Sequence, residues 1–246
     1  GFGPFDGHKP RKYVYRQEHV HSLPHHYIHQ ITEDIQHNIW ILTDGGIAQY
    51  RRSSDDFAIP LDDRGHPILA YSACLTEQGV IFGGRNRIYR YDYDSRSIKL
   101  LLDFSSDPYF AISAISRWDE ETLLCCSRWQ GLRLINLRSG ERRLPPFDCG
   151  KEIMALLIDS HNRIWLAPYN EGLRCFNPEG RLLASYTTDN SGLSNNVVLS
   201  MAERDSHIWV GTDGGGINII HPDSHRITVL EHIPGDNYSL PVNSIL

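Results

Sequence analysis

One unit of sequence recurs five times along this chain. It consists of a short β-run, an Asp or Asn turn, an aromatic or aliphatic β-run, a glycine turn and a further β-run. The clearest copy extends from Val197 to Pro222. Taking its tryptophan as the marker, the equivalent residues are Trp40, Ile81, Leu124, Trp165 and Trp209, at steps of 41, 43, 41 and 44 residues. A period of this size with several strands per unit predicts an all-β fold, a β-propeller of four-stranded antiparallel blades.

The residue types within each unit agree with this fold. Runs such as 39–42 and 197–201 are apolar at odd and even positions, which is typical of strands buried on both faces between neighbouring sheets. Asp34 and Asp159 open predicted hairpin turns, because Asp tolerates turn conformations and bonds its own backbone. Trp40, Trp165 and Trp209 are predicted to lie at equivalent, mostly buried positions in the second strand, as packing residues and not as ligand sites.

The two ends of the chain read as parts of blades. With strands named A to D from the axis outward, residues 1–28 align with the C and D strands and the loop that follows them, whereas residues 233–246 align with the start of an A strand. We therefore expect a fragment with five complete blades and an incomplete ring, although a composite three-stranded blade could close it. The predicted boundaries are 1–20 for the end of a preceding blade, 21–60, 61–104, 105–145, 146–188 and 189–232 for the blades, and 233–246 for the start of the next.

Composition excludes some classes of function. The 24 basic and 30 acidic residues give a net charge of −6 with no basic stripe, so we expect no nucleic-acid partner in this fragment. No segment has the roughly eighteen apolar residues of a membrane span, so we expect contact with a membrane only through a parent chain. The spacing of the five cysteines favours neither a metal site nor a disulfide framework.

Histidines and carboxylates are the remaining candidates for chemistry. The run from His19 to His29 contains five histidines, but no carboxylate or thiol completes a recognisable ligand set, so we predict no metal and no cofactor. A propeller lyase or glycosidase would need paired carboxylates or a metal-held His and Glu at the axis. The available acids sit at repeat-equivalent turns, where a structural role suffices, so we predict no catalytic residue; they are Glu33, Asp34, Asp44, Asp159, Asp205 and Asp213.

A geometric argument identifies a candidate binding surface. In an antiparallel blade the B-to-C turn and the loop to the next blade emerge on the same face, because each strand reverses the last. The first and fifth of these turns, at 44–46 and 213–215, follow a plain Asp-Gly-Gly pattern, whereas the middle three carry bulky polar residues. Such residues stack on sugar rings or pair with carboxylate and sulfate groups, although they also decorate solvent-exposed turns. The candidate ligand-binding residues are Arg85, Arg128, Trp129, Tyr169 and Asn170.

The fifth unit also carries a family resemblance. Its segments Gly192-Leu-Ser-Asn-Asn196 and Ile208-Trp209-Val-Gly211-Thr, with Gly216 and Pro222, resemble the two-component regulator propeller repeat. Such repeats form the periplasmic sensor region of hybrid two-component systems in glycan-degrading bacteria. The resemblance implies two consecutive seven-bladed propellers, a β-sandwich domain, a membrane helix and a histidine kinase with receiver and DNA-binding domains. It also implies a homodimeric receptor that senses an oligosaccharide in the periplasm.

The leading interpretation is therefore a sensory fragment without catalysis, which recognises an oligosaccharide or another periplasmic small molecule. The parent chain would be a histidine kinase anchored in the inner membrane. Two alternatives stay open at this stage: a propeller lyase or glycosidase, and a scaffold for protein interactions.

Overall fold

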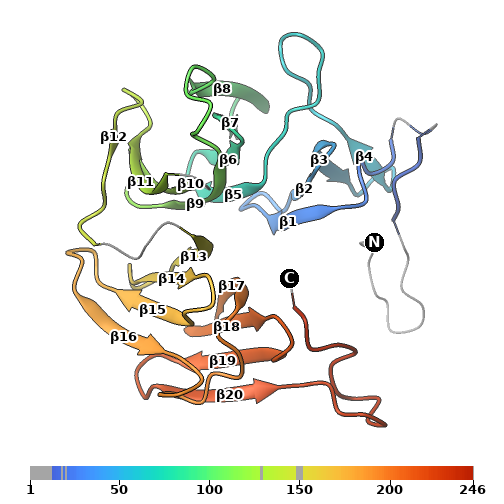
Figure 1. Ribbon diagram of the computed structural model, residues 1–246. Helices are drawn as coiled ribbons and strands as arrows, with labels where there is room; N and C mark the ends of the chain where they lie inside the picture. Colours follow the sequence, from blue (N-terminus) through green and yellow to red (C-terminus); the bar gives the residue numbers. More distant parts are fainter. Residues whose placement is uncertain (1–12, 18, 20, 128–129, 148–151, 246) are drawn as a thin grey trace. The chain divides into compact units, whose positions relative to one another are not determined.

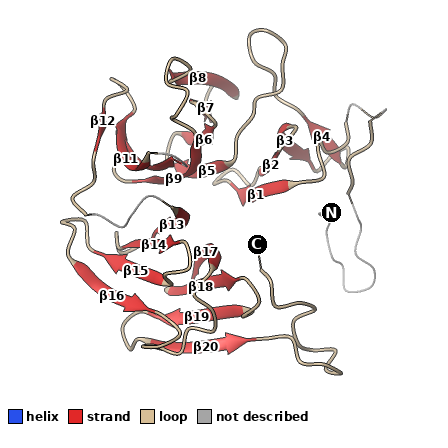
Figure 2. Ribbon diagram, in the orientation of Figure 1, coloured by secondary structure: helices blue, strands red, loops and turns tan. Residues whose placement is uncertain are grey.

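The computed structural model describes residues 13–17, 19, 21–127, 130–147 and 152–245. These residues form twenty β-strands joined by turns and loops (Figure 2). The strands build five antiparallel sheets of four strands each (Figure 1). The predicted all-β propeller with four-stranded blades is thereby confirmed. Among the described residues, no helix has the length and apolar character needed to cross a membrane.

Each blade uses four strands that follow one another in the sequence. Blade one contains β1 (Ile28–Glu33), β2 (Ile39–Thr43), β3 (Gly46–Arg51) and β4 (Asp56–Ala58). Blade two contains β5 (Ser72–Thr76), β6 (Gly79–Gly84), β7 (Arg87–Asp92) and β8 (Ser97–Asp103). Blade three contains β9 (Ile112–Arg117), β10 (Thr122–Ser127), β11 (Gly131–Asn136) and β12 (Arg142–Arg143). Blade four contains β13 (Ile153–Ile158), β14 (Ile164–Pro168), β15 (Leu173–Phe176) and β16 (Leu182–Tyr186), and blade five contains β17 (Val198–Arg204), β18 (His207–Thr212), β19 (Ile217–His221) and β20 (Arg226–Leu230).

The chain divides into two compact units, residues 1–120 and residues 121–246. The first unit holds β1 to β9 and the second holds β10 to β20. Within each unit, the packing between consecutive blades forms the core.

The three tryptophans of the repeat occupy one register. Each lies three residues before the end of the second strand of its blade, in β2, β14 and β18. Trp40 and Trp165 are both only 1% exposed, whereas Trp209 is partly exposed. The predicted strand position is confirmed for all three, and full burial holds for two of them.

Contacts with the following blade bury Trp40 and Trp165. In the first unit Trp40 packs against Phe82 and Tyr91 of blade two, with ring centroids 5.3 and 4.7 Å away. In the second unit Trp165 belongs to a cluster that includes Ile208 of blade five. In both cases the tryptophan of one blade packs against residues of the blade that follows it in sequence. Trp209 of blade five is partly exposed.

Side-chain hydrogen bonds connect the A strand of one blade with the A strand or the A-to-B turn of its neighbour. Gln30 of β1 accepts a hydrogen bond from the backbone N–H of Ala73 in β5 and donates one to its carbonyl. In the second unit, the carboxylate of Glu203 accepts bonds from both the backbone N–H and the hydroxyl of Ser160. Both pairs are separated by 43 residues, about one repeat. These bonds satisfy polar groups where two blades meet.

The described part of the N-terminal segment packs on blade one. The stretch predicted to supply strand C lies outside the described residues. Within residues 13–27 an isolated bridge pairs Tyr15 with Leu23. Tyr13 and Leu23 are buried against Phe57, and the Tyr13 ring meets Phe57 edge-on at 5.4 Å. A backbone hydrogen bond of 3.1 Å from the N–H of Phe57 in β4 to the carbonyl of His21 adds to this side-chain packing.

Candidate functional site

The B-to-C turns lie where the sequence predicts them. In the four blades whose turns are fully described they occupy residues 44–45, 85–86, 169–172 and 213–216. The turn of blade three includes residues 128–129, which lie outside the described residues.

Backbone hydrogen bonds place these turns beside the loops between blades. The N–H of Gly172 donates to the carbonyl of Asn196 at 3.0 Å, and the N–H of Ile112 donates to the carbonyl of Arg85 at 2.5 Å. The N–H of Gly216 likewise donates to the carbonyl of Asn243 at 2.8 Å. Turns and inter-blade loops therefore share one face of each blade, as strand alternation requires. We call this surface, in each unit, the turn face.

The described members of the predicted binding set are exposed on the turn face. Arg85 is exposed at a φ of 27° in the first unit. Tyr169, 53% exposed, and Asn170, at a φ of 57°, share one turn of the second unit. Arg128 and Trp129 lie outside the described residues. The structure thus brings Tyr169 and Asn170 together, and a role of the five residues in ligand binding stays a prediction.

Two of the carboxylates weighed for catalysis have structural partners. Asp34 is 3% exposed and accepts hydrogen bonds from the backbone N–H of Asn38 and from the indole N–H of Trp40. Asp159, also 3% exposed, accepts equivalent bonds from Arg163 and Trp165. Burial by itself raises the pKa of Asp159, but the bonds from Trp165 and Arg163 outweigh it and the pKa lies below its usual range. Both carboxylates hold turns of the backbone, and the lowered pKa of Asp159 does not suit a general acid.

The structure reveals a polar and aromatic cluster in blade one that the sequence analysis did not assemble. Nε2 of His29 lies 2.6 Å from Oδ1 of Asp44 in the B-to-C turn. The His29 ring also contacts Tyr71 and Tyr27, with centroids 4.8 and 5.1 Å away. Within the described part of the chain, no group of three or more His, Cys, Asp or Glu side chains has the geometry to hold a metal ion. One feature of the sequence could have indicated this cluster. Tyr27 and His29 lie on either side of the first residue of a strand, and the Asp-Gly-Gly turn at 44–46 follows the next strand of the same blade.

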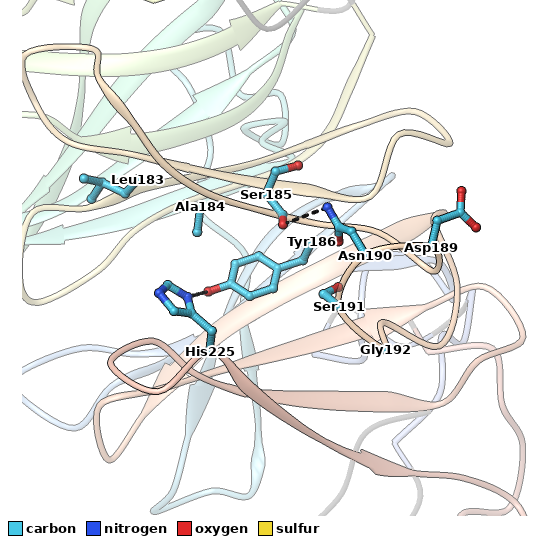
Figure 3. A pocket seen from close by; sticks show the side chains of 9 residues that line it. All are labelled: Leu183, Ala184, Ser185, Tyr186, Asp189, Asn190, Ser191, Gly192 and His225. Atoms are coloured by element: carbon cyan, nitrogen blue, oxygen red, sulfur yellow. Dashed lines mark hydrogen bonds between the residues drawn. The ribbon is translucent and has the colours of Figure 1, made fainter.

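A separate pocket of about 560 Å³ lies between β16, the loop 187–192 and the β19–β20 turn (Figure 3). The hydroxyl of Tyr186 and Nδ1 of His225 are 2.8 Å apart at one side of it. The Asn190 amide donates to the carbonyl of Ser185, and the Ser191 hydroxyl donates to that of Thr187. These polar groups of the pocket thus bond to other groups of the protein.

Comparison with protein families identifies the repeat. Residues 22–45 and 192–214 match the model of the two component regulator propeller. The chain carries two-component regulator propeller repeats. Both matches end at a B-to-C turn, and the first of them includes Tyr27, His29 and Asp44. No curated protein matches the chain in sequence.

Solved structures share the fold at low sequence identity. The extracellular domain of a protein named as a hybrid two component system, BT3049 from B. thetaiotaomicron, is 17% identical with a TM-score of 0.66, over 96% of this chain and 32% of that one. The corresponding domain of BT4673 from the same organism is 21% identical with a TM-score of 0.66, over 92% of this chain and 32% of that one. A WD40 propeller domain of Doa1 is 12% identical with a TM-score of 0.55, over 82% of this chain and 67% of that one. The chain spans about a third of the length of the first two proteins.

Proposed function

We propose that this chain is part of the periplasmic sensor region of a two-component system and that it recognises an oligosaccharide without chemical turnover. The observation that carries the proposal is the presence of two-component regulator propeller repeats in a fold shared with extracellular domains of such systems. In this proposal the parent is a membrane-anchored, homodimeric histidine kinase.

The turn face is the recognition surface in this proposal. Tyr169 offers an exposed ring to the apolar face of a pyranose, and Asn170 beside it offers an amide to hydroxyl groups. Loops and turns on a rigid β scaffold are common carriers of binding residues. The structural partners of Asp34 and Asp159 speak against the alternative of a lyase or glycosidase that uses these acids.

The test is calorimetric titration of the chain with a panel of defined oligosaccharides, with chromatography of the same mixtures to detect cleavage. We expect at least one oligosaccharide to bind and to be recovered intact. Detection of cleavage products would contradict the non-catalytic sensor and support the lyase or glycosidase alternative. Failure of every oligosaccharide to bind would overturn carbohydrate recognition by these blades.

A pair of variants then locates the surface. Tyr169→Ala should weaken binding by about tenfold, because an aromatic ring commonly dominates such a contact. His161→Ala is the matched control, since His161 is exposed on the β13–β14 turn, at the opposite end of the same blade. Equal losses in both variants, or none in Tyr169→Ala, would remove the blade-four turn from the binding surface.

A further inference from the structure

We propose that Tyr27, His29 and Asp44 form a subsite for one neutral pyranose ring on the turn face of the first unit. This inference rests on the proposed function and adds to it a site and a sugar class. All three residues belong to blade one and the loop that enters it.

A β-bulge positions His29. The register between β1 and β2 shifts between Ile28 and Gln30, which leaves His29 without a partner in the ladder. Equivalent shifts occur at the start of β13 and β17, where the skipped residues are Met154 and Leu199. A bulge redirects a side chain relative to a regular strand, and bulges are frequent next to binding sites. Only blade one among these three places an imidazole at this position.

Asp44 keeps capacity to accept further hydrogen bonds. Its Oδ1 atom pairs with Nε2 of His29. Its Oδ2 atom lies 3.9 Å from Nδ1 of His25, and this Nδ1 atom accepts a hydrogen bond from the backbone N–H of Tyr27. The Asp44 side chain is 46% exposed. A carboxylate has room for about four hydrogen bonds, so two neighbouring hydroxyls of a sugar can donate to it.

The aromatic rings supply the apolar part of the subsite. Tyr27 is 53% exposed, and its ring centroid lies 5.1 Å from that of His29; the Tyr71 ring contacts the same imidazole at 4.8 Å. In blade five the carboxylate of the equivalent aspartate, Asp213, accepts a hydrogen bond of 2.6 Å from the hydroxyl of Ser244. In blade one the exposed Tyr27 ring is available for the C–H face of a pyranose.

The charge of the cluster selects the class of sugar. The Oδ1 atom of Asp44 is paired with Nε2 of His29, and the carboxylate can still accept hydrogen bonds from sugar hydroxyls. A uronate or sulfate would bring a second negative charge close to the Asp44 carboxylate. The subsite is therefore suited to a neutral hexose, in contrast to the arginine at position 85, which suits acidic groups.

The experiment is saturation-transfer NMR of the chain with methyl glycosides of glucose, galactose and mannose, and with glucuronate. Concentrations of about 10 mM are needed, because contact with a single ring gives weak affinity. We expect transfer to at least one neutral glycoside and weaker transfer to glucuronate. No transfer to any neutral glycoside, or stronger binding of glucuronate, overturns the subsite.

Variants tie the signal to these residues. Tyr27→Ala and Asp44→Asn should each weaken binding of the neutral glycoside by about tenfold, whereas Tyr27→Phe should retain it. Tyr109→Ala is the matched control, because Tyr109 is 69% exposed on the inter-blade loop between β8 and β9 of the same unit. Unchanged binding in Tyr27→Ala, with thermal unfolding like wild type, overturns the subsite.

The subsite and the proposed function fail in different ways. If an oligosaccharide binds wild type and Tyr27→Ala equally but Tyr169→Ala poorly, the sensor proposal stands and the subsite is wrong. If oligosaccharides do not bind at all, the proposed function fails first.

Discussion

The indole N–H of Trp165 donates a hydrogen bond of 2.9 Å to Oδ2 of Asp159, six residues earlier in the chain. The same carboxylate accepts the backbone N–H groups of His161 and Arg163, so it joins the A-to-B turn to the buried tryptophan. Trp40 and Asp34 repeat the arrangement in blade one at 2.8 Å. In blade five the residue six before Trp209 is Glu203, which bonds instead to Ser160 of the preceding blade.

The first prediction concerns acid stability. Because the folded state holds the pKa of Asp159 below its usual value, the stabilisation by its carboxylate is present above about pH 4 and is lost as the pH falls through the lower folded value. Asp159→Asn should therefore lower stability at neutral pH and flatten its decline in acid. Urea unfolding at steps from neutral to acidic pH measures this, with the exposed Asp189→Asn as control. Parallel pH profiles for wild type and Asp159→Asn would contradict it.

The second prediction compares two tryptophans of equal register. Trp165→Ala should cost about 3–5 kcal/mol, because it removes a fully buried ring between blades four and five. Trp209→Ala should cost clearly less, since its ring is already partly solvated. Chemical unfolding of both variants measures the difference. Similar losses of unfolding free energy in the two variants would show that the burial of the ring does not determine the cost of removing it.

The third prediction concerns two glycines with similar backbone angles. Gly172 has a φ of +74°, and a Cβ there would lie 2.2 Å from the carbonyl oxygen of Tyr186. Gly192 has a φ of +79° with open space around the same position. Gly192→Ala should cost only the conformational penalty of about 1–2 kcal/mol, whereas Gly172→Ala should cost more because the third and fourth strands must separate. Thermal unfolding of both variants shows which one loses more stability. An equal loss in Gly172→Ala and Gly192→Ala would contradict the predicted clash with Tyr186.

The fourth prediction concerns alkaline conditions. Burial raises the pKa of Tyr186 to about 12, compared with an ordinary value of about 10. The protonated phenol is favoured by the folded state, so its contribution is complete below pH 10 and declines as the pH rises from about 10 towards 12. Tyr186→Phe should be less stable at neutral pH, because it loses the bond with His225, but should decline less steeply in alkali. Unfolding midpoints on both sides of pH 10 test this, and equal slopes would argue against it.

Sequence periodicity predicted the blades and the strand position of the tryptophans. The markers Trp40, Trp165 and Trp209 recur at one register because each blade repeats the same hydrogen-bonded ladder, and a ladder is a local property of consecutive strands. The positions of the B-to-C turns follow for the same reason, so the exposure of Tyr169 and Asn170 could be anticipated from alternation alone.

Tertiary structure decided which side chains meet across those strands. The run of histidines had no recognisable ligand pattern, yet a bulge in β1 brings His29 to Asp44, 15 residues away, and the ring of Tyr71, just before β5, also contacts His29. Similarly, the burial of Trp40 and Trp165 depends on contacts with the following blade and not on their own repeat alone. The sequence by itself determined the repeating ladder, because backbone pairing between successive strands is local, whereas burial and side-chain clusters depend on contacts between blades that only the folded chain brings together.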